Sequence, residues 1–442
     1  MSNNCETLKA IKGNIIYPNT AKEISVFRNG CIVYGNDDSD NEIGVIKGVY
    51  EQLPKNLANI LTTDYGDSLI IPGFIDLHTH APQFMQRGIG IDQELIQWLK
   101  QYTFPSERMF IDTELAKDIY QKFIDALIRK GTTRASILAT IHKESTDVLF
   151  KIAIDKGFAG LVGKTNMDQN CPDYLKENTQ QSLYATEELI DRYSDHSSVQ
   201  PIITPRFAPT CSKELLIGLG KLAQQYRTPV QSHLSENVDE VKWVKDIYPQ
   251  HRSYGDIYDS YGLLGETPTM MAHCIYLDEY DIGLLAKRKV TAVHCPQANM
   301  NLASGLMPAR KWQQLGITVG LGTDVGAGHE LAMNKIMVQA IQNSKLIKSN
   351  QSLDYKPYTY KEAFYLGTKG NGQFFNALES YQQKNLKVGS LEEGYILDAL
   401  IIDDENLGST DISLEERLQR FLYIGDDRNI ISRYINGNQI EL

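Results

Sequence analysis

The sequence has few cysteines, and no two of them are spaced as a pair. Six cysteines are scattered over 442 residues, at positions 5, 31, 171, 211, 274 and 295, with no CxxC motif among them. This spacing is typical of free thiols in a reducing compartment and argues against a disulfide framework.

Long apolar runs and blocks of basic residues are also missing. No run approaches the roughly 18 to 20 apolar residues that cross a membrane. The first residues, MSNNCE, are polar and lack the apolar core of a secretory signal. Lys and Arg number 44 against 55 Asp and Glu, a formal charge of −11, whereas nucleic-acid binders carry a basic patch. We therefore expect a soluble cytoplasmic protein that binds neither nucleic acid nor membrane.

The composition and length are those of a folded globular protein. Hydrophobic residues make up 42% and charged residues 22%, so wholesale disorder is excluded. The length fits about three domains of roughly 150 residues, but a barrel can use about 250 residues as one domain.

The order of apolar segments predicts a barrel flanked by a second domain. Residues 1–68 contain short strand-like runs and turns, and strand-like runs return in 381–442. Between them, apolar strands alternate with amphipathic helices; the expected strands are 69–78, 135–140, 158–164, 199–204, 229–233, 270–273, 290–294 and 317–323. Eight such units predict an α/β fold, a (β/α)8 barrel over 69–380. The two terminal segments, 1–68 and 381–442, are expected to form one small β-sandwich-like domain.

The strongest local motif is PGFIDLHTHAPQ at 72–83, which ends the first expected barrel strand. His78 and His80 are two residues apart on that strand, so both side chains lie on the same face. Alone, such a pair also fits two surface histidines. Its position at the carboxyl end of a barrel strand, where active sites of this fold form, indicates a shared ligand.

Other residues that can bind a metal also stand where expected strands end. They are His233 at the end of the fifth strand, His273 at the end of the sixth and Asp324 at the end of the eighth. Singly, each histidine fits a hydrogen-bonded core group and the aspartate fits a helix cap. Together at one end of a barrel, imidazole and carboxylate groups predict a site for a divalent ion such as zinc.

Three further segments reach the same mouth of the expected barrel. Glu236 follows His233 by three residues and fits either a proton shuttle or a capping acid. Arg206 and Phe207 follow the fourth strand. They fit either two pocket residues or a surface arginine beside a packed phenylalanine ring. The polar string 294–301 either lines the pocket or caps its loop.

At these residues the sequence resembles the amidohydrolase superfamily and, within it, the guanine deaminases. The motif at 72–80 is similar to the superfamily's metal strand, and APQ at 81–83 to the guanine deaminase branch. Arg206-Phe207, SHLSE at 232–236, HCP at 294–296 and GTDVG at 322–326 are similar to segments of the same family. The terminal segments 389–403 and 425–430 are similar to its composite β-domain.

The resemblance implies an activity and a role for each site residue. One zinc ion per subunit would be held by His78, His80, His233 and Asp324, with His273 beside the attacking water. Substrate contacts would be Gln83, Arg206, Phe207, His80, His233, Glu236 and Asp324. Family members are typically homodimers. Some superfamily branches bridge two metals with a carboxylated lysine, and Lys164 closes the third expected strand, but the resembled branch is mononuclear.

The implied reaction is hydrolysis of guanine to xanthine and ammonia, with Glu236, Asp324 and His273 as catalytic residues. Asp324 would accept a proton from water, His273 would orient that water, and Glu236 would protonate a ring nitrogen beside C2. Two alternatives stay open: a related deaminase acting on another amino-substituted heterocycle, and a catalytically silent scaffold with the same fold. Silent relatives usually lose ligands, whereas all five expected residues are present here.

Overall fold

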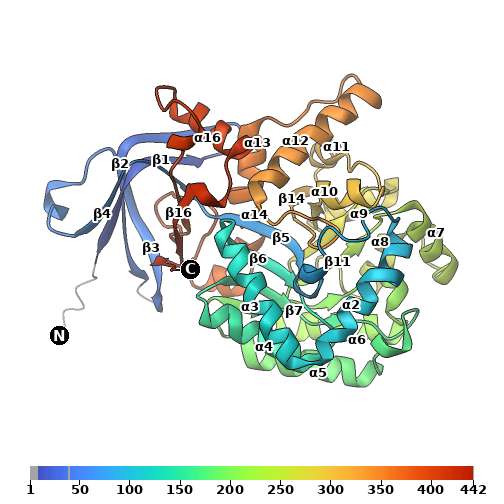
Figure 1. Cartoon of the computed structure of the whole chain (residues 1–442). Coiled ribbons are helices and arrows are strands. Elements are labelled where there is room, and N and C mark those ends of the chain that lie inside the picture. The colour runs from blue at the N-terminus through green and yellow to red at the C-terminus, as the bar shows by residue number, and fades with distance from the viewer. Residues whose placement is uncertain (1–7, 38–39, 442) are drawn as a thin grey trace.

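The computed structural model describes residues 8–37 and 40–441, which form a barrel and a sheet built from both chain ends (Figure 1). The strands of the two ends, blue and red in Figure 1, lie together on one side of the barrel. The polar start of the chain and Cys5 lie outside the described residues. The other five cysteines are free thiols. No described helix is both long enough and apolar enough to cross a bilayer.

Eight parallel strands line the barrel in the part of the chain that the structure describes. They pair in two four-stranded sheets, ordered β5-β6-β7-β9 and β11-β12-β13-β14. Ile203 bridges to Val230 between the sheets, and Asp324 N donates to His78 O at 2.8 Å on the other side, which closes the barrel. The strands are β5 (Phe74–His80), β6 (Thr132–Leu138), β7 (Ala159–Gly163), β9 (Val199–Pro201), β11 (Val230–Leu234), β12 (Thr269–His273), β13 (Thr291–His294) and β14 (Thr318–Leu321). A short pair, β8 (Thr165–Asn166) and β10 (Thr204–Pro205), extends beyond β7 and β9.

Helices follow the strands in turn, so the predicted (β/α)8 barrel is confirmed. They are α1 (Leu95–Trp98), α2 (Phe104–Arg108), α3 (Thr113–Arg129), α4 (Lys143–Asp155), α5 (Thr179–Tyr193), α6 (Lys213–Tyr226), α7 (Val238–Ile247), α8 (Tyr254–Ser260), α9 (Glu279–Lys287), α10 (Pro296–Asn301), α11 (Ala309–Gln314), α12 (Met333–Asn350), α13 (Tyr360–Tyr365), α14 (Asn371–Asn376), α15 (Glu379–Gln383) and α16 (Leu414–Ile424). α3 illustrates why they form: Asp112 caps its first turn, and Ile119, Phe123 and Leu127 bury one face.

The chain ends meet in one seven-stranded sheet among the described residues, ordered β17-β16-β15-β4-β1-β2-β3. Its strands are β1 (Lys9–Pro18), β2 (Ile24–Asp37), β3 (Asp40–Tyr50), β4 (Leu61–Pro72), β15 (Ala399–Ile402), β16 (Ile430–Ile435) and β17 (Asn438–Gln439). The composite origin of this sheet agrees with the prediction. The sheet also folds over on itself, because Gly44 N on β3 donates to Asn436 O after β16 at 2.7 Å, so the predicted small β-sandwich-like domain built from both termini is confirmed.

The first barrel strand begins later than expected. Residues 69–72 were assigned to it from the sequence, but β4 carries them in the terminal sheet and β5 begins at Phe74. Gly73 separates the two strands, and a Cβ there would lie 2.3 Å from the Thr133 hydroxyl. Only glycine fits that contact, which an apolar run does not reveal. The domain bounds 1–68, 69–380 and 381–442 stay a prediction.

A buried arginine joins the barrel to the terminal sheet. Arg134 on β6 pairs with Asp398, which precedes β15, at 2.5 Å between Nε and Oδ2. Its guanidinium also donates to the Tyr381 hydroxyl at 2.8 Å and to the Asn436 side chain. Asp398 in turn accepts from the Asn436 backbone at 2.8 Å. Because both charges are buried, each depends on the other for compensation.

We expect Asp398→Asn to lower the free energy of unfolding by about 3–5 kcal/mol, because it leaves the Arg134 charge buried and unpaired. Urea denaturation measures the change. The control is Asp118→Asn, which breaks the exposed pair with Lys122 and should cost no more than about 1 kcal/mol. Equal small losses in the two variants would contradict a connecting role for Arg134.

Candidate active site

Four side chains converge at the carboxyl ends of the barrel strands. Nε2 of His80 lies 3.2 Å from Nε2 of His78 and 3.3 Å from Nε2 of His233. Oδ1 of Asp324 lies 3.3 Å from Nε2 of both His78 and His80. These four ligand atoms all lie within 4.8 Å of one another. The sequence prediction that these residues meet is thus in accord with the geometry.

The spacing and chemistry of this quartet fit a zinc ion. Tetrahedral zinc with ligands at about 2.0–2.2 Å separates its ligand atoms by about 3.3–3.6 Å. Four of the six separations are 3.2–3.3 Å, close to that range, and all six lie within 4.8 Å. Three imidazoles and one carboxylate are borderline donors, which suit zinc better than the all-oxygen sets of calcium or magnesium.

Neighbouring groups orient the ligands. Nδ1 of His233 lies 2.6 Å from the Arg206 carbonyl, which can only accept, so Nδ1 carries the proton and Nε2 keeps its lone pair for a metal. Asp76 accepts from the His78 backbone at 3.1 Å and from the Thr323 backbone at 3.0 Å. This carboxylate ties the first barrel strand to the loop that carries Asp324.

Burial and hydrogen bonding shift the pKa values of His80, His233 and Asp324. Burial lowers the pKa of His80 and of His233, so both rings are neutral at physiological pH. Burial alone would raise the pKa of Asp324, but hydrogen bonds from His78 and His80 outweigh it and hold that pKa well below its usual value. Neutral imidazoles and an ionised carboxylate are the forms in which these side chains bind a cation.

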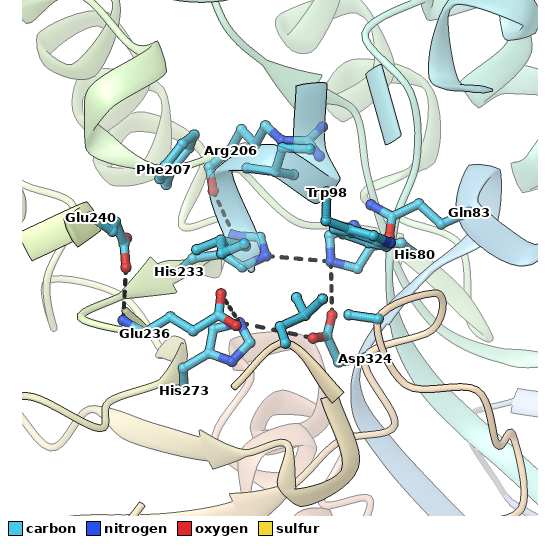
Figure 2. A pocket seen from close by; sticks show the side chains of 14 residues that line it. His80, Gln83, Trp98, Arg206, Phe207, His233, Glu236, Glu240, His273 and Asp324 are labelled. Atoms are coloured by element: carbon cyan, nitrogen blue, oxygen red, sulfur yellow. Dashed lines mark hydrogen bonds and ion pairs between the residues drawn. The ribbon is translucent and has the colours of Figure 1, made fainter. Parts of the chain in front are cut away.

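Glu236 and His273 lie side by side next to the quartet, as Figure 2 shows. Oε2 of Glu236 is 3.4 Å from Nε2 of His273, and Ser304 donates to the other carboxylate oxygen at 2.9 Å. Burial, reinforced by the Asp324 charge, raises the pKa of Glu236 well above its usual value. Burial lowers the pKa of His273 to about 4. The pair therefore offers a carboxyl group that holds its proton more tightly than a free glutamate does, beside an imidazole that is neutral at physiological pH.

A pocket of about 420 Å³ opens above these groups. Its polar lining includes Gln83 and Arg206, both buried, and its apolar walls are Leu95, Trp98, Leu99, Phe207, Leu302 and Ala327. A cavity in which apolar walls surround a few fixed polar groups is typical of a small-molecule site. Arg206 and Phe207 are therefore pocket residues rather than a surface arginine and a packed ring.

Glu240 was not predicted and explains why Glu236 does not act as a cap. Oε2 of Glu240 accepts from the backbone of Glu236 at 2.8 Å and of Asn237 at 3.1 Å, and Tyr254 donates to Oε1 at 2.8 Å. Asn237 and Glu240 thus form the capping box of α7. The Asn-x-x-Glu spacing was a readable signal for this box. The Glu236 side chain is left free to face the pocket.

We expect Glu240→Ala to lower kcat by about 10- to 100-fold, because the backbone that aims Glu236 loses both hydrogen bonds. Steady-state kinetics and thermal unfolding measure the two effects separately. Glu362→Ala is the matched control, since it removes the acid of the α13 capping box away from the pocket. The control should lose stability but keep kcat; parallel losses of kcat would assign Glu240 to stability alone.

Lys164, the residue that could have supported a second metal, is held elsewhere. Its Nζ pairs with Glu177 at 2.5 Å and also donates to the Thr165 carbonyl at 3.1 Å and to Ser182 at 3.3 Å. None of these three partners belongs to the quartet of His78, His80, His233 and Asp324. This arrangement favours a single metal position.

The polar string 294–301 begins at the end of β13 and lies outside the pocket lining. His294 ends β13 and is buried, α10 begins two residues later, and none of residues 294–301 lines the pocket. Asn299 approaches His273 at 3.5 Å between Oδ1 and Nδ1. Cys295 lies near His273 and Asp324. Burial raises the pKa of this thiol well above its usual value.

Comparison with known proteins identifies the family. The family model described as "Amidohydrolase family" matches residues 69–440. The chain belongs to the amidohydrolase family. Guanine deaminase of Dictyostelium discoideum is 37% identical over 98% of each chain, and that of Homo sapiens is 36% identical over 84% of this chain and 82% of its own. The crystal structure of guanine deaminase from C. acetobutylicum with guanine bound in its active site superposes with a TM-score of 0.93, at 48% identity over 98% of this chain and 100% of that one.

Membership confirms the resemblance stated from the motifs at 72–83, 206–207, 232–236 and 322–326. Amidohydrolases are generally metal-dependent hydrolases, and the His78, His80, His233 and Asp324 quartet is a candidate metal site of the expected kind. The amidohydrolase barrel thus carries its metal-competent side chains at one end, together with the acid and the imidazole.

Proposed function

We propose that this amidohydrolase converts guanine and water into xanthine and ammonia. The observation that carries the proposal is one pocket that combines the metal-competent quartet with Glu236, Arg206 and Gln83. Relatives that are 36–37% identical over most of the chain are guanine deaminases, and a related structure at 48% identity holds guanine in its active site.

Arg206, Gln83 and Phe207 would recognise the base. A guanidinium can only donate, so Arg206 suits the carbonyl of guanine and would be left unpaired by the amine of adenine. The side-chain amide of Gln83 both donates and accepts, which suits the mixed edge of a lactam purine. Phe207 offers an apolar wall for the ring. Discrimination that rests on an unpaired buried group can reach about 10⁴-fold.

Proton transfer would fall to Glu236, Asp324 and His273. The ionised Asp324 accepts a proton from the attacking water, while the neutral His273 fixes the orientation of that water. Glu236, whose pKa is raised by burial, donates a proton to the ring nitrogen beside C2 as the oxygen adds to C2. A proton then passes through Glu236 to the amino group, which leaves as ammonia. The atoms balance as guanine plus water giving xanthine plus ammonia.

We further propose one zinc ion per subunit, held by His78, His80, His233 and Asp324, with His80, His233 and Asp324 also facing the substrate. When bound, the ion lowers the pKa of water to about 7 and so supplies hydroxide at neutral pH. The homodimer and the cytoplasmic location expected from the sequence stay predictions. The silent-scaffold alternative has little support, because all five predicted metal-site residues meet in one place.

A substrate panel tests the proposal. Guanine, adenine, guanosine and an amino-triazine are each incubated with the protein as purified, and ammonia release is measured. We expect guanine to exceed adenine in kcat/KM by about 10⁴-fold. Turnover of the triazine with none of guanine would replace this function with the related-heterocycle alternative.

A further inference from the structure

Glu107 links the two polar residues that would recognise the base. It lies on α2 and is buried, and its side chain does not line the pocket. Nε2 of Gln83 donates to Oε1 of Glu107 at 3.0 Å, and Arg206 pairs with Oε2. One carboxylate therefore holds two pocket residues that come from different strand ends of the barrel.

The contact with Glu107 fixes which way the Gln83 amide points. A carboxylate can only accept, so the nitrogen of Gln83 must face Glu107. On the other side, the Gly326 backbone N–H donates to Oε1 of Gln83 at 3.1 Å. The contacts with Glu107 and Gly326 require the same orientation of the Gln83 amide. Gln83 is left with one N–H donor and one oxygen lone pair to offer a substrate, at known positions.

The same carboxylate also balances the charge of Arg206. The Arg206 side chain is 5% exposed and that of Glu107 3% exposed, so neither charge is compensated by water. The guanidinium lies over the Phe104 ring, 5.1 Å from its centroid, on the same short helix as Glu107. The recognition end of the pocket therefore carries donors but no net charge.

We infer that Glu107 is a positioning residue that makes this pocket selective for uncharged purine bases over anionic ones. The inference rests on the proposed guanine deamination. A neutral lactam receives the Arg206 donors without adding charge. An anionic ring brings its charge next to the Glu107 carboxylate, with no net positive charge to meet it. Without the Glu107 charge, the positive charge of Arg206 is uncompensated and favours an anionic ring.

Kinetics of Glu107→Gln form the first arm of the test. The neutral amide keeps the shape of the side chain, but its nitrogen cannot accept from Gln83 and its charge no longer balances Arg206. We expect the KM for guanine to rise about 10- to 100-fold. We expect kcat to stay near that of the unchanged protein, because these contacts support substrate and transition state alike.

The matched control is Glu177→Gln. It neutralises the carboxylate of another buried ion pair, with Lys164, beside the third barrel strand and without contact to Gln83 or Arg206. A general loss of stability at the barrel mouth would affect both variants alike. We expect the KM of this control for guanine to match that of the unchanged protein.

Ligand binding forms the second arm and needs no turnover. Isothermal titration calorimetry compares neutral hypoxanthine with the urate monoanion at neutral pH in both proteins, each loaded with zinc. We expect Glu107→Gln to bind hypoxanthine about tenfold more weakly and urate about tenfold more tightly. These opposite signs cannot come from damage to the pocket, which would weaken both ligands.

The outcomes are distinct. Failure of the unchanged protein to deaminate guanine overturns the proposed function. Normal guanine turnover with an unchanged KM in Glu107→Gln overturns the inference alone, as does a parallel weakening of both ligands.

If Glu107→Gln does not fold, Glu107→Asp takes its place: it keeps the charge but shortens the side chain. It should then raise the KM for guanine without strengthening urate binding, and any gain in urate affinity would contradict the inference.

Discussion

Glu236→Gln should keep its metal and lose about 10²- to 10⁴-fold in kcat, the usual contribution of a positioned proton transfer. Glutamine fills the same space and can still receive the hydrogen bond from Ser304. It cannot deliver a proton to the ring nitrogen or pass one to the leaving amine. Steady-state kinetics on guanine together with metal analysis of the same preparation measure both halves of this expectation.

Asp281→Asn is the control for Glu236→Gln. Asp281 on α9 is another buried acid, and burial raises its pKa to about 6. It accepts from the Gly255 backbone at 3.0 Å and from Ser253, contacts that an asparagine oxygen can keep, and it lies outside the pocket. The control should retain wild-type turnover. Full activity in Glu236→Gln would remove the proton shuttle from the mechanism.

His80→Ala should abolish both metal binding and turnover. Nε2 of His80 lies within 3.3 Å of three other ligand atoms, so its loss would remove one of the four groups that would hold the ion. The unchanged protein is expected to hold about one zinc per chain, and the variant much less than that, because zinc needs all of its protein ligands in place. Mass spectrometry of the metal content and ammonia release measure the two losses.

His142→Ala is the control for His80→Ala. His142 follows β6 at the same end of the barrel but does not line the pocket. Its loss should leave metal and turnover in place. A His80→Ala protein that keeps a full equivalent of zinc and normal turnover would contradict the proposed ligand set. Removal of zinc by a chelator and its restoration should reproduce the same loss and recovery.

The metal quartet was predictable because its signals are local. His78 and His80 share a face through the two-residue repeat of a strand, and each of His233 and Asp324 follows a strand that composition reveals. Once eight strands are recognised, the fold itself brings their carboxyl ends together. No distance had to be known to place these four residues in one site.

The roles of Glu107 and Trp98 could not be predicted from the sequence, because no local pattern marks them. Glu107 meets Gln83 across 24 positions and Arg206 across 99, and neither spacing follows from a strand or helix period. Its helix, α2, follows a π-helical turn at Leu99–Thr103, so the faces of that segment do not keep a regular 3.6-residue repeat. Gly73 is similar: its need for glycine comes from Thr133, sixty positions away.

The most direct test of the account follows the oxygen that enters the product. Guanine is incubated with zinc-loaded protein in water labelled with heavy oxygen, and xanthine and ammonia are quantified by mass spectrometry and by an ammonia assay. We predict one labelled oxygen in each xanthine, one ammonia per xanthine, and neither product from zinc-stripped protein. Guanine recovered unchanged from zinc-loaded protein, or xanthine without the label, would contradict hydrolytic deamination at this site.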